Sequence, residues 1–403
     1  MLERRVSEII DHALVANVFG KDFKFRKNQR NIIETICNTY IEDPTSTIVV
    51  DAPTGAGKSL IAMWSAHVLK ELGNKGYMVT SDLSLQDQYE SDFFKYGLRW
   101  PSIKGVDNYE CSVNGLPFSL GDCKLKGMGY EAAKELPCYN SCEYLQNRSR
   151  AINQPISLLN YSFWLIQRNY VEEKMKIEER EVPFKQRNFV FFDEAHKMDE
   201  IVQNHFSPRI DVNITDKLMT LSRFLSKHGL LSTSFTKGRV NSLVNELMTG
   251  NKSEVYSAIK EFDHILKGLN RLRKGANKYV KTRYGKSTVP KDWQKSFTTF
   301  DLIKDMHCKF DDYLELISRV GIDKMVLDQG ETESKFMCVE ESSMIKRYLH
   351  DRADFKVFMS ATIGDPRAFV KIMGITNAKF IRLDNNFNYD KSPVVFVNRH
   401  KLS

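Results

Sequence analysis

Short, nearly continuous apolar runs alternate along the chain with stretches in which apolar residues recur at helical spacing. Four of these runs are predicted to be buried strands, namely Thr47–Val50, Tyr77–Thr80, Phe189–Phe192 and Lys356–Met359. Residues 1–46 are expected to be helical up to an acidic-proline stop, and Ile61–Lys70 is expected to form a second helical region. Strands this apolar, separated by helices, suit a parallel sheet with both faces covered. The expected fold class is therefore α/β.

Two long segments interrupt this α/β pattern. Residues 104–154 are rich in Gly, Cys and Lys and show little periodicity. Residues 205–352 are strongly helical in composition and contain no convincing strand. We interpret both as insertions into one α/β core, which would comprise residues 1–103, 155–204 and 353–403.

Composition and charge narrow the class of protein only slightly. The chain has 403 residues, of which 42% are hydrophobic and 27% charged, as expected for a soluble globular protein. Its apolar runs are too short to span a bilayer, and the N-terminal residues show no apolar signal-peptide core. We therefore expect a cytoplasmic protein with no membrane partner and with cysteines kept as thiols. The net charge of +8 mildly favours a polyanionic partner such as nucleic acid.

A glycine-rich loop follows the first predicted strand and opens a helix. Its sequence, Ala52-Pro-Thr-Gly-Ala-Gly-Lys-Ser59, has the spacing and context of a nucleotide-binding P-loop. The two glycines let backbone N–H groups turn toward phosphate oxygens, Lys58 can reach the β- and γ-phosphates, and the Ser59 hydroxyl suits Mg²⁺. The residues expected to bind the nucleotide here are Thr54, Gly55, Ala56, Gly57, Lys58 and Ser59.

An acidic motif, Asp193-Glu-Ala-His196, directly follows the predicted strand Phe189–Phe192. At the carboxyl end of a buried parallel strand, Asp193 can hold Mg²⁺ through a bound water, and Glu194 can polarise an attacking water. Together with Lys58, the residues Asp193, Glu194 and His196 are the catalytic candidates. The P-loop and the acidic motif together predict hydrolysis of ATP.

Four cysteines, Cys111, Cys123, Cys138 and Cys142, lie in residues 104–154 with gaps of 11, 14 and 3 residues. Four thiolates suit either a 4Fe–4S cluster or a tetrahedral Zn²⁺ ion, and a reduced, metal-free state is the third alternative. The spacing alone slightly favours zinc. A segment of about 50 residues with few periodic apolar positions is near the size at which folding needs a metal.

A basic stretch lies inside the helical segment. Residues 267–295 contain ten Lys or Arg against one acid, with Tyr279, Tyr284 and Trp293 interleaved. Positive charge can follow a phosphate backbone, and aromatic rings can stack on bases. From the residues alone, binding of single-stranded nucleic acid and a merely solvent-exposed hairpin tip are equally good interpretations. The candidate contacts are Arg271, Arg273, Lys274, Tyr279 and Tyr284.

The order of these motifs resembles that of superfamily 2 helicases, and in particular the XPD/DinG family of iron–sulphur DNA helicases. Residues similar to the family's motifs are Arg26–Gln29 (Q-motif), Asp51–Leu60 (motif I), Ser81–Gln88 (motif Ia), Lys104–Cys111 (start of the cluster domain), Leu159–Tyr161 (before motif II), Asp193–His196 (motif II) and Ser360–Thr362 (motif III). In the family's Q-motif, Gln29 would read adenine, and Arg26 would also contact the nucleotide.

The resemblance implies a RecA-like P-loop motor domain that carries an iron–sulphur insertion at residues 104–154 and a helical arch at residues 205–352. It reverses the preference for zinc in favour of a 4Fe–4S cluster, with Zn²⁺ as the alternative. It also implies DNA contacts at Ser81 and Gln88, and it places the basic stretch in the arch around the translocating strand. Ser360 and Thr362 would couple ATP hydrolysis to movement.

The function that the resemblance implies is an ATP-dependent DNA helicase or translocase, moving 5′→3′ on single-stranded DNA or a forked duplex in DNA repair or replication. Such motors hydrolyse ATP between two RecA-like domains, and the second carries an arginine finger. The chain ends about 40 residues after motif III, and residues 384–393 are similar to the linker toward that second domain. We therefore expect the second domain to come from a longer protein or a separate chain, and this chain alone to hydrolyse ATP weakly or not at all.

Two other functions remain open from the sequence. One is an ATP-gated subunit that binds single-stranded DNA without translocating. The other is a DEAH-type RNA helicase, which fits less well because such enzymes have nothing like the cysteine-rich insertion.

Overall fold

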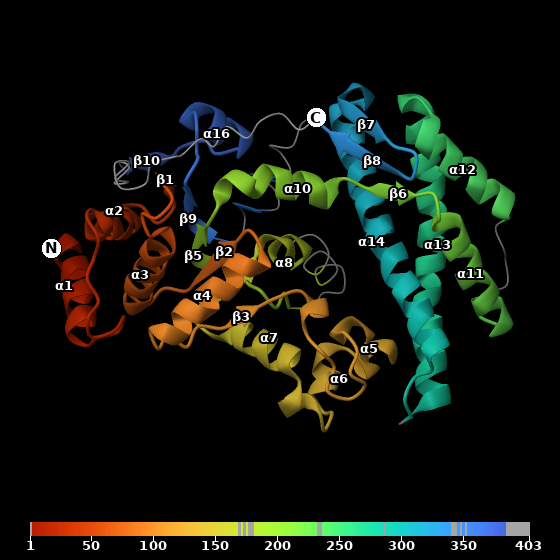
Figure 1. Cartoon of the computed structure of the whole chain (residues 1–403), viewed down its shortest axis with the longest axis horizontal. Coiled ribbons are helices and arrows are strands. Elements are labelled where there is room, and N and C mark those ends of the chain that lie inside the picture. Colours follow the sequence, from red (N-terminus) through yellow and green to blue (C-terminus); the bar gives the residue numbers. More distant parts are fainter. Residues whose placement is uncertain are drawn as a thin grey trace, which may run out of the picture.

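The structure of the protein is a computed structural model, and Figure 1 shows the whole chain. It describes residues 2–167, 181–231, 236–285, 287–339 and 353–383, together with positions 171, 175, 345, 346, 349 and 350. The helices, strands and contacts below concern these residues. The predicted linker at residues 384–393 lies outside them.

Seven parallel strands form the centre of the molecule (Figure 1). Their order across the sheet is β10–β1–β9–β5–β2–β4–β3, and every neighbouring pair is parallel. The strands are β1 (Thr47–Asp51), β2 (Gly76–Thr80), β3 (Ser102–Ile103), β4 (Ile156–Asn160), β5 (Arg187–Phe192), β9 (Ala353–Ser360) and β10 (Lys379–Arg382). The four predicted strands are confirmed as β1, β2, β5 and β9. The apolar pattern does not predict the other three.

Alternate side chains of these strands enter two hydrophobic cores, one on each face of the sheet. In β5, Phe189 and Phe191 enter one core, whereas Val190 and Phe192 enter the other. Both faces are covered, which explains why the strands are apolar at successive positions. Helices α1 (Leu2–Val15), α2 (Gln29–Glu42), α3 (Lys58–Glu71) and α4 (Leu83–Lys95) contribute to the first core. Helices α7 (Glu143–Asn153), α8 (Tyr161–Ile166), α10 (Met198–Phe206) and α16 (Pro366–Ile372) contribute to the second.

The N-terminal region contains two helices separated by a turn, so the expectation of helix throughout residues 1–46 is wrong between α1 and α2. Phe19 in this turn stacks on Trp64 of α3, with 4.1 Å between the ring centroids. Phe23 and Phe25 pack around the same tryptophan. Burial of these aromatic rings against α3 holds the chain in a turn where its composition alone permits a helix.

The cysteine-rich segment forms short elements between β3 and β4. They are the 3₁₀ turns η1 (Val106–Asn108), η2 (Phe118–Leu120) and η3 (Tyr139–Ser141) and the helices α5 (Asp122–Leu125) and α6 (Tyr130–Lys134), followed by α7. Before α7, no described element in this segment exceeds five residues. Elements this short cannot produce a periodic apolar pattern, which agrees with the sequence.

The segment after α10 is mainly helical but also contains a small sheet. Its helices are α11 (Ile214–Lys227), α12 (Lys237–Thr249), α13 (Lys252–Tyr284) and α14 (Lys291–Val320), and the last two form a long hairpin (Figure 1). The 3₁₀ turn η6 (Ile322–Lys324) follows. Although α13 has 33 residues, no described helix is apolar enough to cross a membrane.

Strands β6 (Arg209–Asp211), β7 (Met325–Gln329) and β8 (Glu333–Cys338) form an antiparallel sheet in the order β6–β8–β7. The prediction that residues 205–352 lack strands is therefore wrong. Exposed or half-buried positions alternate with buried ones along β8, which is the period-2 signal of a strand. That signal extends over only six residues, too few to stand out beside four helices.

The far end of the α13–α14 hairpin contacts the cysteine-rich segment. The side-chain amide of Asn277 donates to the backbone oxygen of Leu125 at 2.7 Å, and Lys126 Nζ donates to the backbone oxygen of Ser287 at 3.3 Å. A Cβ added to Gly127 would lie 2.9 Å from the Cβ of Asn277. The two segments that interrupt the α/β core are therefore in close contact with each other.

Arg187 ties the start of β5 to the neighbouring strands and to α7. Its side chain is only 8% exposed. It donates to the backbone oxygens of Gly76 and Ala151 at 2.8 Å each and to Ser157 Oγ at 3.0 Å. The guanidinium group also lies 4.1 Å from the centroid of the Tyr77 ring. Because Ala151 belongs to the last turn of α7, the cation meets the negative end of that helix.

We expect Arg187→Ala to lower the free energy of unfolding by roughly 3 kcal/mol, because it leaves several buried acceptors unpaired and removes a packed side chain. Arg209→Ala is the matched control. Arg209 is about half exposed and pairs with Glu333 across 3.3 Å, and such surface pairs contribute about 0–1 kcal/mol. Urea unfolding followed by circular dichroism measures both losses. Equal losses would contradict the anchoring role of Arg187.

Candidate functional site

Four neighbouring strands bring the predicted motifs to one edge of the sheet. β1, β9, β5 and β2 are adjacent and parallel, so the residues that follow them emerge side by side. The P-loop follows β1, motif II follows β5, and Ser360 ends β9. The backbone N–H of Ala52 donates to the oxygen of Ser360, and that of Asp193 donates to the oxygen of Val79, both at 2.8 Å. Ligands of open α/β sheets bind at this edge.

The loop after β1 has a backbone that suits a phosphate group. Gly55 and Gly57 have φ angles of 84° and 81°, in the left-handed region that glycine adopts without strain. Helix α3 begins at Lys58, immediately after the second glycine, so the unpaired N–H groups of its first turn lie beside the loop. Thr54 is exposed on the loop.

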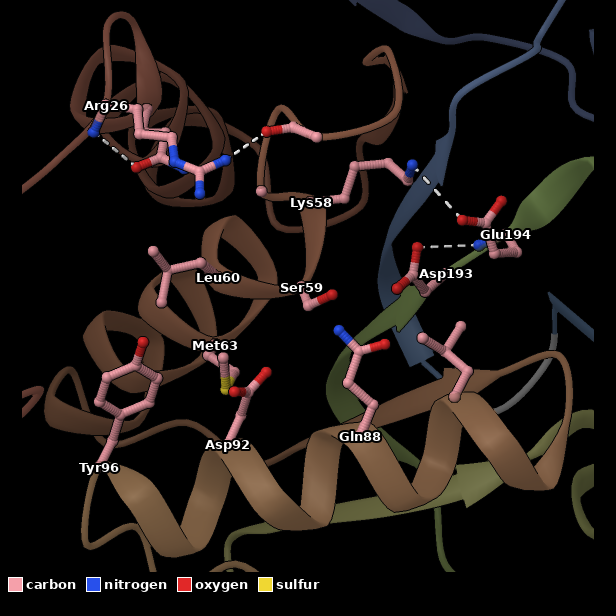
Figure 2. A pocket seen from close by; sticks show the side chains of 14 residues that line it. Arg26, Lys58, Ser59, Leu60, Met63, Gln88, Asp92, Tyr96, Asp193 and Glu194 are labelled. Atoms are coloured by element: carbon pink, nitrogen blue, oxygen red, sulfur yellow. Dashed lines mark hydrogen bonds and ion pairs between the residues drawn. The ribbon is translucent and has the colours of Figure 1, made fainter.

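Gln29, the first residue of α2, and Arg26, which precedes the helix, brace this loop, and Figure 2 shows Arg26 reaching it. Gln29 is 1% exposed; its Nε2 donates to the backbone oxygen of Ala56 at 3.0 Å, and its Oε1 accepts the backbone N–H of Arg26 at 2.8 Å. The Arg26 guanidinium donates to the backbone oxygen of Gly55. The amide nitrogen of Gln29 therefore holds the loop directly, and its oxygen fixes the backbone of Arg26, whose side chain holds the loop at Gly55. Its predicted contact with adenine stays a prediction.

Lys58 extends from α3 toward the loop after β5 (Figure 2). Its Nζ lies 3.4 Å from Glu194 Oε1, and the two side chains are 9% and 23% exposed. Charged groups this shielded from water need a partner, because burial of an unpaired charge is costly. The two side chains that the sequence assigns to a phosphate and to a water molecule therefore neutralise each other in this structure.

Asp193 is buried close to this ion pair and is 4% exposed. Its Oδ2 accepts a hydrogen bond from the Tyr89 hydroxyl at 2.8 Å, and its Oδ1 accepts one from the Glu194 backbone N–H at 2.9 Å. Burial raises the pKa of Asp193 and raises that of Tyr89 well above its ordinary value, so Tyr89 stays protonated as a donor. The nearby Ser59 side chain opposes this rise in the pKa of Tyr89. One tyrosine thus lies beside both residues predicted to hold Mg²⁺.

Tyr89 is a site residue that sequence reasoning misses. It directly follows the last residue of motif Ia in α4, and its only signal is that a polar-tipped aromatic residue occupies a core-facing helical position. A tyrosine in that position is usually read as ordinary packing. Its contact with Asp193 becomes visible only when β2 and β5 are paired.

Motif II continues through a strained turn. Glu194 has φ 51° and ψ 46°, a left-handed conformation that is uncommon for residues other than glycine and that clusters at functional sites. His196 Nδ1 lies 2.7 Å from Ser360 Oγ and 3.2 Å from Glu194 Oε2. Ser360 Oγ accepts the backbone N–H of Thr362 at 3.1 Å. Motif II and motif III are therefore in direct contact through His196 and Ser360.

A cavity of about 380 Å³ lies beside these residues, within the size range of ligand pockets. Its wall includes residues of the P-loop, the Q-motif, motif II and one face of α4. The α4 residues are Leu85, Gln88 and Asp92, with Tyr96 directly after the helix, and Gln88 points toward Ser59 in Figure 2. The resemblance implies that Gln88 contacts DNA, whereas the structure places it in this cavity. Ser81 is not part of the wall; its hydroxyl donates to the N-cap residue of α4 at 2.8 Å.

The four cysteines of the inserted segment lie near one another. Cys111, Cys123 and Cys142 are buried, and Cys138 is half-buried. Burial raises the pKa of Cys123 to about 11; Lys124 opposes this rise, and the charges of the other three thiols add to it. Nevertheless, among the described residues no group of three His, Cys, Asp or Glu side chains is close enough to hold a metal ion. The thiols are neighbours without forming a tight single-ion site.

The charged residues of the basic stretch differ in their exposure and in their partners. Arg271 and Lys274 are exposed on α13. Arg273, between them in sequence, is paired with Asp301 of α14 at 2.5 Å, and its side chain is only 22% exposed. The guanidinium group of Arg273 is therefore committed to holding the hairpin together.

The aromatic residues of the same stretch support the hairpin. Tyr279 stacks on Trp293, which is 1% exposed, with 5.2 Å between the ring centroids. The Tyr279 hydroxyl also lies 3.4 Å from His228 Nδ1. Tyr284 is half-buried and packs against the same core. These rings fill the hairpin core instead of forming an open stacking surface.

Comparisons with known proteins agree with the fold. Residues 22–215 match a protein family described as Type III restriction enzyme, res subunit. An XPD helicase structure superposes with a TM-score of 0.53 at 15% identity, over 89% of this chain and 62% of that one. A structure described as truncated XPD gives a TM-score of 0.49 at 14% identity, over 89% of this chain and 100% of that one. A search of curated protein sequences found no match.

The similarity to the XPD helicase structure shows the fold. The chain has a RecA-like fold similar to that of XPD helicase, so the predicted RecA-like α/β fold is confirmed. The iron–sulphur character of residues 104–154 stays a prediction. The chain spans 62% of the length of the XPD helicase structure that it matches.

Gly57→Ala is expected to destabilise the protein more than Gly55→Ala. Both substitutions force alanine into a left-handed conformation, which costs about 1–2 kcal/mol. Only at Gly57 would the new methyl group also meet Gln29, whose Nε2 would lie 2.3 Å away, while a Cβ at Gly55 would meet nothing within 4 Å. Urea unfolding of both variants measures the difference. In a double-mutant cycle, Gln29→Ala should recover the excess loss of Gly57→Ala, and simple additivity of the two changes would contradict the contact.

Proposed function

We propose that the chain is a motor portion of an ATP-dependent DNA helicase or translocase. The observation that carries the proposal is the meeting of Lys58, Ser59, Asp193 and Glu194 at the carboxyl edge of the sheet, beside a cavity of about 380 Å³. The XPD-like fold supports it. Movement in the 5′→3′ direction and action on single-stranded or forked DNA are parts of the proposal that come from the motif resemblance.

The chain's own residues would bind the nucleotide as follows. The N–H groups of the P-loop and of the first turn of α3 would donate to phosphate oxygens, and Lys58 would meet the β- and γ-phosphates. Ser59 would hold Mg²⁺ directly and Asp193 through water. The metal ion would neutralise charge on the phosphates during transfer. Glu194 would orient the attacking water and accept its proton.

The ion pair between Lys58 and Glu194 gives nucleotide binding a further consequence. A triphosphate carries more negative charge than one carboxylate, so Lys58 is expected to leave Glu194 when the phosphates enter. The carboxylate then becomes free to accept a hydrogen bond from water. His196, 3.2 Å from Glu194 and 2.7 Å from Ser360, would keep the carboxylate oriented and connect it to motif III. Binding of the substrate would thus release the base that hydrolysis needs.

Two further parts complete the proposed motor. A single DNA strand would cross the carboxyl edge near Ser81, which lies at the end of β2 and outside the nucleotide cavity. A second RecA-like domain, from a longer protein or a separate chain, would close over the nucleotide and contribute an arginine finger, a group that accelerates phosphoryl transfer by about 10³–10⁵.

We also propose that Cys111, Cys123, Cys138 and Cys142 bind a 4Fe–4S cluster. Their proximity supports this, because each of the other three thiols influences Cys123. The described residues contain no group of three side chains that could hold a metal ion as they stand, so the choice of a cluster over Zn²⁺ rests on the motif resemblance. A cluster distributes its ligands over several iron atoms. It would stabilise a segment built from short elements with a small core.

Glu194→Gln should separate nucleotide binding from hydrolysis. We expect it to bind ADP and ATP at least as tightly as the unsubstituted chain, because the amide no longer competes for Lys58, and to hydrolyse ATP about 10²–10⁴ times more slowly. Lys58→Ala should lose both binding and turnover. Fluorescent-nucleotide titration and phosphate release, with single-stranded DNA and an added second motor domain, measure these effects. Glu200→Gln, an exposed acid on α10, is the control. Normal turnover in Glu194→Gln would refute its role as the base.

Cys138→Ser should remove iron and the brown colour of the purified protein while sparing nucleotide binding. Cys138 is the least buried of the four cysteines, so its replacement should disturb packing least. Cys308→Ser, on α14 outside the cysteine-rich segment, is the control and should leave the metal content unchanged. Elemental analysis and visible absorption are the measurements. Zinc in place of iron in the unsubstituted chain would exclude the cluster.

A further inference from the structure

A row of five cations runs along one face of α13. We call it the α13 stripe, and it consists of Lys267, Arg271, Lys274, Lys278 and Lys281. Successive spacings of four, three, four and three residues keep these side chains on the same face of a helix, and all five residues are exposed. With a rise of 1.5 Å per residue, the stripe is about 21 Å long.

The charge of the α13 stripe is not neutralised within the described part of the chain. From His264 to Tyr284 the helix contains no acidic residue. None of the five stripe residues forms an ion pair with a described residue, whereas Arg273, which faces α14, is paired with Asp301. Arg273 is therefore used to hold α13 to α14, and the five stripe residues are left for an external anion.

The α13 stripe has positive charge without exposed aromatic rings. Tyr279 stacks on Trp293, and Tyr284 packs against the hairpin core. Sites for single-stranded nucleic acid usually combine a basic groove with rings on which bases stack, and this face lacks such rings among its described residues. A straight cationic row instead matches a stiff polyanion. Double-stranded DNA carries one negative charge per about 1.7 Å of its axis and stays straight over far more than the length of the stripe.

A glycine beside the stripe leaves the helix backbone there without a side chain. Gly268 lies in the interior of α13, where glycine is about 1 kcal/mol less favourable than alanine. A Cβ at this position would meet no atom within 4 Å, and its φ is not left-handed. Neither packing nor backbone conformation therefore requires glycine here. Glycine also allows a ligand to approach the backbone closely, and Gly268 adjoins Lys267 and lies three residues before Arg271.

We propose that the α13 stripe binds the phosphate backbone of double-stranded DNA and docks the duplex arm of a forked substrate. The inference extends the proposed function and rests on it for the choice of DNA as the polyanion. Phosphate contacts carry no sequence information, so this binding is independent of sequence and weakens steeply with salt. It is separate from the path of the single strand across the sheet edge.

The first test neutralises the middle of the stripe. The triple variant Arg271→Gln/Lys274→Gln/Lys278→Gln should bind a blunt DNA duplex roughly tenfold or more weakly at low salt. Its slope of log affinity against log salt should be shallower by about 2–3, since each lost phosphate contact removes about 0.9. Affinity for an oligo-dT strand and for ADP should stay within about twofold of the unsubstituted chain. The control is Arg223→Gln/Lys227→Gln/Lys237→Gln, which removes the same charge from α11 and α12 and should leave duplex binding unchanged.

The second test does not depend on removing side chains. Gly268→Glu should weaken duplex binding by adding a negative charge beside the stripe, while its unfolding temperature stays equal or rises, because glutamate favours a helix more than glycine does. Gly268→Gln is the neutral control of the same shape and should bind duplex more tightly than Gly268→Glu. Equal duplex affinity of these two variants would overturn the inference.

The two proposals fail in different ways. A chain that binds ADP and oligo-dT, but whose duplex binding does not respond to the stripe substitutions, overturns the duplex-docking inference and leaves the motor proposal standing. Equal losses for duplex and oligo-dT also overturn it, because they would make the stripe a general DNA surface. Failure of the unsubstituted chain to bind nucleotide would refute the motor proposal without affecting the duplex measurement.

Discussion

The register of β5 is the constraint on which the candidate site depends. The register of most strands is fixed because buried apolar residues alternate with exposed polar ones. β5 is apolar on both faces, so this alternation cannot fix its register. Polar groups at its two ends supply the missing information. Arg187 at one end is held by buried backbone oxygens of β2 and α7, and Asp193 at the other end is held by Tyr89. A slip of one residue would break both sets of hydrogen bonds, and it would also carry Glu194 away from Lys58.

The pairing of β1, β9, β5 and β2 then assembles the rest of the site. Neighbouring parallel strands end at the same edge of the sheet. The loops that follow them therefore lie side by side, although they are far apart in the sequence. The contacts between motifs are correspondingly short and direct: Lys58 with Glu194, and His196 with Ser360. The two inserted segments contact each other away from this edge, through Asn277 and Leu125. Nucleotide chemistry and the α13 stripe can therefore be altered independently.

The sequence predicts well those strands and loops whose conformation is set by neighbouring residues in the chain. Buried strands, the P-loop and motif II are each visible within ten residues, and the order of the motifs identifies the fold. Features that depend on tertiary contacts are not predicted: the turn before α2 is held by Trp64 of α3, and the strand β8 is short and surrounded by helices. The location of Gln88 in the nucleotide cavity and the hydrogen bond from Tyr89 require the paired strands. The roles of the cysteines are a matter of ligand chemistry, which the spacing leaves open.

The geometry of motif II shows why such a site keeps its reactive groups paired. A lysine that is only 9% exposed would be costly to bury alone, and Glu194 supplies the compensating charge. That same contact holds Glu194 in a left-handed conformation, which costs roughly 1–3 kcal/mol and is stable only because Lys58, His196 and the buried backbone around it fix the turn. The pair therefore stabilises the chain and at the same time withholds the carboxylate from water. An anion that attracts Lys58 more strongly breaks its ion pair with Glu194. Occupation of the phosphate site therefore also frees the carboxylate that hydrolysis needs.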